Sequence, residues 1–217
     1  KNVADFIDQY SEVSFDSVYK PRGAYNNEYA DILFGLNKGD VFGPYRDKNS
    51  FKISRLLDRK KNASLRASHI LIAYKGATRS PSDITLTKTE ARRKANRILR
   101  EVKKASTNFA ELARENSDGP TKSRGGDLGF FQEGEMAVEF FNFVNNNKVG
   151  KVGIVETEYG FHVIRITDKD DLALIADVVA EALPSDKTSN EIFRKATQFE
   201  MDTREKNEFN IIAERNG

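Results

Sequence analysis

A glycine-rich stretch constrains the fold of this chain more than any other segment. It reads Gly125-Gly126-Asp127-Leu128-Gly129-Phe130-Phe131. Glycines permit tight turns and close backbone packing, and here they border a short apolar run of the kind that forms a strand. Met136 and Phe140 follow, four residues apart, and are expected on one face of a helix. Together with Leu128 they predict a small apolar socket, although ordinary core packing explains the same spacing.

Both histidines of the chain stand in strand-like runs, one on each side of that stretch. The runs are Ser68-His69-Ile70-Leu71-Ile72 and Gly160-Phe161-His162-Val163-Ile164. In the first run, a period of two predicts two opposite faces, namely His69, Leu71 and Ala73 against Ile70, Ile72 and Tyr74. Because both faces are mostly apolar, this run is expected at the centre of a sheet. A histidine in such a strand is commonly a hydrogen-bonded core residue, and this interpretation stands beside a functional one.

Taken in order, three segments resemble the parvulin family of peptidyl-prolyl isomerases: Ala67–Leu71, Gly125–Gly129 and Gly160–Ile164. The resemblance implies an α+β domain over residues 63–169, with a four-stranded antiparallel sheet surrounded by helices. It implies an enzyme that interconverts the cis and trans forms of X-Pro bonds, within a larger foldase of the SurA and PpiD kind. The location that it implies is the periplasm or cell envelope.

The resemblance also implies roles for individual residues. His69 and His162 match the paired histidines of the family, and Thr157 matches a hydroxyl residue of their network. The family's proline pocket is matched position by position by Leu128, Met136 and Phe140.

One position departs from the family pattern. Parvulins place a Cys or Asp shortly after a Ser-Asp segment, facing the substrate carbonyl. In this chain either Asp118 fills that role after a small shift, or Gly119 occupies the position and the acidic group is missing. Asp118 is the favoured candidate. Arg79 and Lys75, in the loop that follows the first strand, are interpreted as solvated charge rather than as ligands of an acidic substrate side chain.

Rotation about an X-Pro bond must cross a barrier of ~20 kcal/mol but makes and breaks no bond. No cofactor or metal is therefore expected. The chain has no cysteine, which excludes disulfides, thiolate metal sites and a cysteine nucleophile. Unfolded or proline-containing polypeptides are the expected partners, with outer-membrane proteins among them. The alternative function is a non-catalytic parvulin-like chaperone module that binds extended polypeptide segments.

Charge and hydropathy limit the remaining function classes. The chain has 35 basic and 33 acidic residues, interspersed along its length, and a net charge of +2, so a nucleic-acid partner is not expected. No apolar run approaches the ~20 residues that span a bilayer. The sequence starts without Met or a signal peptide, so we expect a piece of a longer protein, which leaves room for an anchor outside it.

The flanks of the isomerase-like region resemble two halves of one further copy. Residues 25–39 align with 136–150 without a gap, and Phe51-Lys52-Ile53 aligns with Phe161-His162-Val163. Arg194-Lys195-Ala196 followed by Phe209 aligns with Arg93-Lys94-Ala95 followed by Phe109. Residues 1–62 are therefore interpreted as the C-terminal half of a degenerate parvulin-like unit, and residues 170–217 as its N-terminal half.

In this degenerate unit, Lys52 and Asp177 stand where the histidines would be, so it is expected to be inactive. Neither half buries an apolar core alone, and the two are expected to pair. Pairing within one chain is one outcome, and exchange of halves in a homodimer is the other.

Local patterns predict several further elements. Helices are expected over residues 3–10, 87–102 and 188–202, the second with a capping box of Thr87 and Glu90. Asn108 is expected to cap a short helix. A turn is expected at Gly43-Pro44, and a solvated linker at Arg59-Lys60-Lys61-Asn62.

Overall fold

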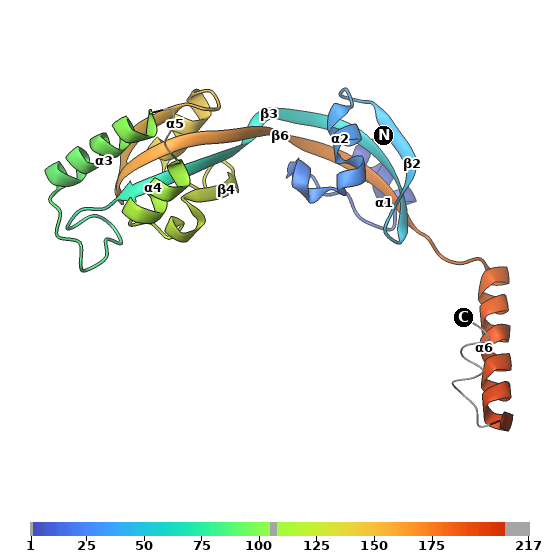
Figure 1. Ribbon diagram of the computed structural model, residues 1–217. Coiled ribbons are helices and arrows are strands. Elements are labelled where there is room, and N and C mark those ends of the chain that lie inside the picture. Colours follow the sequence, from blue (N-terminus) through green and yellow to red (C-terminus); the bar gives the residue numbers. More distant parts are fainter. Residues whose placement is uncertain (1, 105–107, 207–217) are drawn as a thin grey trace. The chain divides into compact units, whose positions relative to one another are not determined.

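The computed structural model describes residues 2–104 and 108–206, and Figure 1 shows its helices and strands. Two strands, β3 and β6, are much longer than the rest. In chain order the elements are α1 (Val3–Tyr10), β1 (Lys20–Pro21), the 3-10 helix η1 (Arg22–Ala24), α2 (Asn27–Gly35), β2 (Val41–Asp47), β3 (Ser50–Ile72), α3 (Lys88–Val102), α4 (Phe109–Asn116), the 3-10 helix η2 (Lys122–Arg124), β4 (Asp127–Phe131), α5 (Val138–Asn146), β5 (Val152–Thr157), β6 (Gly160–Glu181) and α6 (Asp186–Lys206).

These residues form two compact units. One contains residues up to 15, residues 43–54 and those from 177 onward, and the other contains residues 16–42 and 55–176. Strands β3 and β6 each contribute to both units. The domain boundaries expected after residues 62 and 169 therefore fall inside continuous strands.

The linker predicted at Arg59–Asn62 is wrong, because this segment belongs to strand β3. The Arg59 guanidinium donates to the carbonyl of Leu36 at 2.7 Å, and Asn62 N–H donates to the Asp171 carboxylate at 2.9 Å. The two lysines between them are exposed, which gives the segment the composition of a linker. The charged composition of the segment indicates that its side chains are exposed, but it does not show whether the backbone is paired. The strand forms because its backbone bonds to β6, which is far away in the sequence.

The turn predicted at Gly43-Pro44 is also wrong, because both residues lie within strand β2. A Cβ built on Gly43 would lie 2.7 Å from the carbonyl oxygen of Lys52. The glycine therefore permits the close approach of β2 to β3, its neighbour in the sheet.

In the second unit, β3 and β6 are the central strands of the sheet. Antiparallel pairing joins β4 to β3 and β5 to β6. His69 contacts His162, and Asn62 contacts Asp171, so rising residue numbers on β3 meet falling numbers on β6, as in an antiparallel pair. The prediction of an antiparallel sheet surrounded by helices is confirmed.

The two faces of this sheet carry different cores. One face packs under α3 and α4 through Ile70, Ile72, Ala91, Ala95, Ile98, Phe109, Ala113, Phe161 and Val163. The other packs under α5 through Leu65, Ala67, Phe131, Phe140, Val144, Ile164 and Ile166. Alternate residues of β3 and β6 thus enter opposite cores, as the period of two predicts. The histidines belong to the α5 side.

The predicted helices of this unit begin where the sequence places their caps. The Thr87 hydroxyl accepts a hydrogen bond from Glu90 N–H, and the Glu90 carboxylate accepts one from Thr87 N–H, which completes the capping box. Asn108 caps α4 through Ala110 N–H. These caps satisfy amide groups that the first helical turn leaves without partners.

A separate core of the second unit lies under α2. It contains Leu33, Phe34, Leu56, Ala173 and Ile175. The short strand β1 pairs antiparallel with β6 in the same region, with Lys20 opposite Ala173. The Arg22 guanidinium lies over the Phe34 ring and forms an ion pair with Asp170 at 3.1 Å. Segments from both flanks of the isomerase-like region thus share one core.

In the first unit, the flanking strands also meet within a single chain. Ala182 N–H donates to the carbonyl of Asn49 at 2.8 Å, and the Ser54 hydroxyl donates to the Asp177 carboxylate at 2.5 Å. The expected helix at the C-terminal side is present as α6. Phe209, used in the repeat comparison, lies outside the described residues. That these flanks descend from two halves of a parvulin unit stays a prediction.

Within the described residues, no helix has both the length and the apolar character that crossing a bilayer requires.

Gly126 fixes the distance between the glycine-rich stretch and β3. Its φ is +82°, and a Cβ built on it would lie 2.2 Å from the carbonyl oxygen of His69. The His69 N–H donates to the Gly126 carbonyl at 2.9 Å. Only glycine allows this approach, which brings the backbone of residues 125–129 against the strand that carries His69.

We predict that Gly126→Ala lowers the free energy of unfolding by more than about 3 kcal/mol, because a methyl group cannot fit against a backbone carbonyl. Gly134→Ala is the matched control, since Gly134 has a φ of +90° but a Cβ built on it would meet no atom within 4 Å. The control should lose only about 1 kcal/mol, from backbone strain alone. Chemical denaturation of both variants measures the difference, and equal losses would contradict the steric explanation.

Candidate functional site

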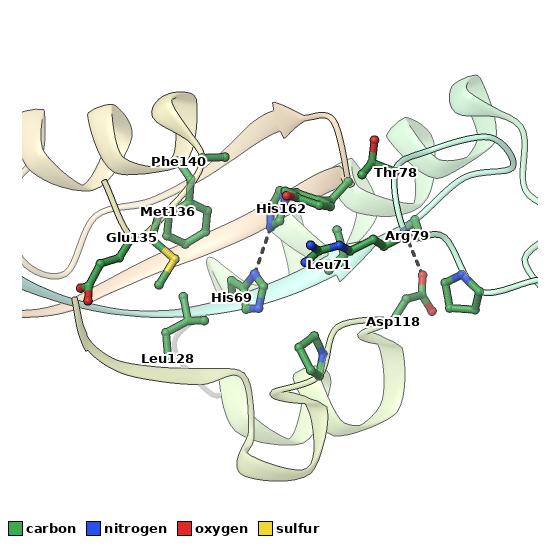
Figure 2. Close-up of a pocket in the computed structure, with 15 residues that line it drawn as sticks. His69, Leu71, Thr78, Arg79, Asp118, Leu128, Glu135, Met136, Phe140 and His162 are labelled. Atoms are coloured by element: carbon green, nitrogen blue, oxygen red, sulfur yellow. Dashed lines mark hydrogen bonds between the residues drawn. The ribbon is translucent and has the colours of Figure 1, made fainter. Parts of the chain in front are cut away.

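A pocket of about 470 Å³ opens on the α5 side of the sheet in the second unit (Figure 2). Strands β3, β4 and β6, the turn before α5 and the loop after β3 all contribute to it. It is lined by His69, Leu71, Ala73, Thr78, Arg79, Pro81, Asp118, Pro120, Leu128, Glu135, Met136, Ala137, Phe140, Tyr159 and His162. The structure therefore brings together six of the seven site residues expected from the sequence.

One end of the pocket is apolar. Leu128 projects from β4, Met136 from the turn after it, and Phe140 from α5, and Figure 2 shows the three gathered beside the histidines. The expectation that Met136 and Phe140 share a helix face is wrong, because α5 begins at Val138. The turn nevertheless directs Met136 into the same pocket. The Phe140 ring meets both histidine rings edge-on, with centroids 5.8 and 5.4 Å apart.

Two histidines and two threonines form a continuous hydrogen-bonded row, which we call the histidine chain. The Nδ1 atoms of His69 and His162 lie 3.0 Å apart. Nε2 of His162 lies 2.8 Å from the hydroxyl of Thr157, and Nε2 of His69 lies 3.1 Å from the hydroxyl of Thr121. Thr157 does not line the pocket, but it joins the network as expected, through His162.

Burial keeps both histidines uncharged. Each has only 6% of its surface exposed. Loss of hydration lowers the pKa of His69 to about 4. Loss of hydration, followed by repulsion from His69, lowers the pKa of His162 to about 3. Both imidazoles are therefore neutral at pH 7, with one N–H each.

Neutrality allows only two proton arrangements in the histidine chain. In one, Thr157 donates to His162, His162 to His69, and His69 to Thr121. In the other, every bond is reversed. A neutral imidazole has one donor and one acceptor nitrogen, so reversing one bond reverses the next. The Tyr159 N–H also donates to the Thr157 hydroxyl, at 3.2 Å, which holds that end of the row in place.

The structure separates the roles of Asp118 and Gly119. Asp118 lines the pocket, but its carboxylate accepts a hydrogen bond from Ala73 N–H at 2.9 Å. A Cβ built on Gly119 would lie 3.5 Å from His69 Nε2. Gly119 thus occupies the position that faces the histidine pair, and no side chain projects there.

Thr121 is the site residue that the sequence analysis missed. It is buried, and its hydroxyl is the partner of His69 Nε2. It stands in a loop between α4 and η2, where no helical or strand period reveals the direction of a side chain. In the sequence, the one feature that could have indicated Thr121 is its place two residues after Gly119, a candidate for the site.

The loop after β3 gives the pocket its charge. Lys75 N–H donates to the Leu86 carbonyl and Thr78 N–H to the Glu158 carbonyl, which closes the loop over the pocket rim. Arg79 lines the pocket, with its guanidinium 6.0 Å from the centre of the Tyr159 ring. Lys75 is not among the lining residues. Arg79 is nevertheless exposed, so its interpretation as solvated loop charge stays a prediction beside a role in the pocket.

No group of three or more histidine or acidic side chains that could hold a metal ion is present in the part of the chain that the structure describes. The two histidine side chains of the pocket instead bind each other and two threonines. The site offers an apolar surface and two neutral imidazoles, with one cationic and two acidic side chains, Arg79, Asp118 and Glu135, also lining the pocket. The apolar surface beside the imidazoles is suited to holding an uncharged ring next to a polar amide.

Comparison with known proteins gives a consistent family. The model of the PPIC-type peptidyl-prolyl isomerase (PPIase) domain matches residues 51–170. The chain is 30% identical over 163 residues to the chaperone SurA of Alcanivorax borkumensis, covering 72% of this chain and 36% of that one. It is 27% identical over 185 residues to foldase protein PrsA 2 of Bacillus cereus, covering 82% and 61%. The chain therefore spans about a third of the first relative's length.

Solved structures include the peptidyl-prolyl isomerase ESS1 from Candida albicans, with 31% identity, a TM-score of 0.48, and coverage of 50% of this chain and 65% of that one. PrsA from Bacillus anthracis is similar at 28% identity and a TM-score of 0.41, covering 61% and 49%. The family expected from the histidine runs and the glycine-rich stretch is confirmed: this chain belongs to the PPIC-type PPIase domain family, the parvulins.

Proposed function

We propose that residues 63–169 act as a peptidyl-prolyl cis-trans isomerase on unfolded or folding polypeptides, within a larger foldase. The observation that carries this proposal is the apolar end of the pocket, directly beside two neutral histidines. Leu128, Met136 and Phe140 form a surface of the size and polarity that suit a pyrrolidine ring.

The pocket supports rotation by binding the twisted amide better than the planar one. At the transition state the X-Pro bond loses conjugation, over a barrier of ~20 kcal/mol. Held against the socket, the ring is fixed while the preceding carbonyl turns. Because catalysis requires stronger binding of the transition state than of either ground state, polar groups near the turning carbonyl lower the barrier.

The histidine chain supplies such polar groups without a charge. A cationic imidazole would attract water and distort the apolar socket, whereas a neutral one leaves it dry. In this proposal Thr121, His69, His162 and Thr157 act together, since each fixes the donor or acceptor state of the next. Asp118 contributes by holding its loop against β3 through Ala73 N–H.

A non-catalytic binding module is the second candidate, favoured by the missing side chain at Gly119. Without a polar group there, the socket would simply hold proline-containing segments. A protease-coupled isomerisation assay on a panel of X-Pro peptides distinguishes the two. Acceleration over the uncatalysed rate supports the enzyme, whereas binding without acceleration supports the module.

The proposed partners are unfolded polypeptides, with outer-membrane proteins among them, and the proposed location is the periplasm or cell envelope. The relatives are named as a chaperone and a foldase, which supports a polypeptide client. A homodimer through the flanking halves is the alternative to pairing within one chain, since exchanged flanks would make the same strand contacts.

We also infer that the flanks are diverged copies of the isomerase unit. The alignments of residues 25–39 with 136–150 and of residues 51–53 with 161–163 support this inference, because their order and spacing agree. Helices α2 and α5 each have nine residues, and each precedes a hairpin with a two-residue turn. Lys52 binds the Asp47 carboxylate at 2.6 Å, in the positions that correspond to His162 and Thr157 of the other hairpin. Asp177 accepts a hydrogen bond from the Ser54 hydroxyl, whereas Lys52 binds Asp47. The two residues that align with the histidines therefore do not pair with each other as His69 and His162 do.

We predict that Met136→Ala and Phe140→Ala each lower kcat/KM by at least about tenfold. Each removes apolar contact with the prolyl ring worth roughly 1–3 kcal/mol. Val138→Ala is the matched control, because Val138 lies on the same helix as Phe140 but is 69% exposed. The isomerisation assay measures all three, with thermal melts to confirm folding. Unchanged activity in the folded pocket variants would contradict the assigned socket.

We predict that Arg79 selects for an acidic residue before proline. Arg79→Gln should lower kcat/KM for Glu-Pro peptides by about tenfold and leave Leu-Pro peptides within about twofold, because only the first loses an ion pair. The comparison control is Lys75→Gln, outside the pocket lining. Equal losses for both peptides would show that Arg79 has no part in selecting the substrate.

We predict that acid destabilises the fold through the histidine pair. The unfolded chain takes up protons near pH 6.5, but the folded histidines do so only near pH 4 and 3. The stability from neutral histidines is therefore complete above about pH 7 and is lost as the pH falls towards 3, at up to about 1.4 kcal/mol per pH unit for each histidine.

Denaturant unfolding between pH 7 and 4 tests this, with His69→Asn/His162→Asn as the comparison that removes the slope. If that variant does not fold, an NMR titration of the wild-type imidazole protons replaces it. Titration of either histidine above pH 5.5 in the folded chain would contradict the prediction.

A further inference from the structure

Helix α3 carries a large excess of positive charge. Between Lys88 and Lys104 the chain has eight basic residues and two acidic ones, a net charge of +6, whereas the whole chain carries +2. The remainder of the chain is therefore net acidic. Arg93, Arg97 and Arg100 are exposed, and their spacing of four and three places them along one face of the helix.

At the C-terminal end of this row the surface is hollowed. A pocket of about 480 Å³ lies between the end of α3 and the strands β5 and β6. Its charged lining side chains are all basic and all exposed: Lys103, Lys104, Lys151 and Arg165. Across the described ranges of the chain, none of these four takes part in a salt bridge.

Helix stability does not account for this arrangement. Like charges three or four residues apart destabilise a helix. Cations near the C-terminus interact favourably with the helix dipole, which explains Lys103 and Lys104. The dipole does not reach Arg93 in the first half of α3, and Lys151 and Arg165 lie on other segments. Several segments of chain thus direct positive charge to one place at a cost in self-repulsion.

We propose that this pocket and the arginine row bind phosphate groups, presented by the headgroups of an anionic lipid surface. Guanidinium groups bind phosphate oxygens in pairs, and clustered Lys and Arg side chains draw proteins to anionic bilayers. The apolar face of α3, with Ala91, Ala95 and Ile98, is buried in the core. Attachment is therefore electrostatic and peripheral, without insertion of the helix.

The surface suits lipid headgroups better than nucleic acid. Among the residues that the structure describes, Val102 and Val152 are the only large apolar ones that line the pocket, and none of the described lining residues offers an aromatic ring to stack on a base. The net charge of +2 is also low for a nucleic-acid binder. The site lies outside the pocket of the proposed isomerase and shares no lining residue with it.

Vesicle co-sedimentation of the 217-residue chain tests the proposal. We expect binding to vesicles of phosphatidylglycerol and phosphatidylcholine in equal parts, none to pure phosphatidylcholine, and release by added salt. Lys103→Gln/Arg165→Gln should weaken binding at least tenfold. The control Lys61→Gln/Lys122→Gln removes the same charge from exposed positions elsewhere and should change binding less than twofold.

A second measurement separates the sources of phosphate. Inorganic phosphate, added during an amide NMR titration, should shift the signals of Lys151 and Arg165 at millimolar concentration. Phosphate binding without vesicle binding would overturn the lipid assignment, and so would tighter binding to duplex DNA than to vesicles. Equal weakening in the control variant would overturn the site itself, and melting curves confirm that both variants fold.

Discussion

The hydrogen bond between the Nδ1 atoms of His69 and His162 joins the two strands on which the rest of the isomerase domain is arranged. β3 and β6 lie next to each other at the centre of the sheet, and each carries one histidine on the α5 side. A buried polar contact of this kind is stable only when both partners are satisfied on their far sides. Thr121 and Thr157 provide those partners, so three segments far apart in the sequence must come together: the strand with His69, the loop with Thr121 and the hairpin with Thr157 and His162.

The apolar socket depends on the same contact. Phe140 lies edge-on to both imidazole rings, so the position of the histidines decides where α5 places its aromatic side chain. Gly126 has no side chain, and this allows the strand with Leu128 to lie close to the backbone of His69. A neutral pair is essential here. A charged imidazole inside an apolar pocket would have to be hydrated, and the water would occupy the space that a prolyl ring requires.

The sequence predicts the part of the fold that local chemistry determines. The alternation in residues 69–74, the capping box at Thr87 and the glycine-rich stretch each report backbone geometry directly. Prediction fails where partners are distant. Arg59–Asn62 has the composition of a linker, yet it is a strand because β6 lies beside it. Nothing in the sequence shows that the loop after β3 closes over the pocket and brings Arg79 to its lining.

The residues of the candidate site also differ in how far the sequence predicts their positions. Residues on strands and helices are placed in the pocket by their period, whereas Thr121 and Gly119 lie in a loop without a period. The choice between Asp118 and Gly119 cannot be made from spacing, because a shift of one residue in a loop leaves the flanking elements unchanged. The structure places the Asp118 carboxylate on Ala73 N–H, and it places Gly119 against His69 Nε2.

The hairpins β2–β3 and β5–β6 differ in the electrostatics of their polar side chains. In the isomerase domain, buried Thr157 and His162 are both neutral, and their hydrogen bond continues to a second histidine. In the other hairpin, Asp47 and Lys52 form an ion pair with side chains 14% and 25% exposed. An ion pair must keep its hydration or its partner, because removing both is costly. The Lys52–Asp47 ion pair joins two strands of one hairpin, whereas the hydrogen bond between Thr157 and His162 continues to His69 on another strand.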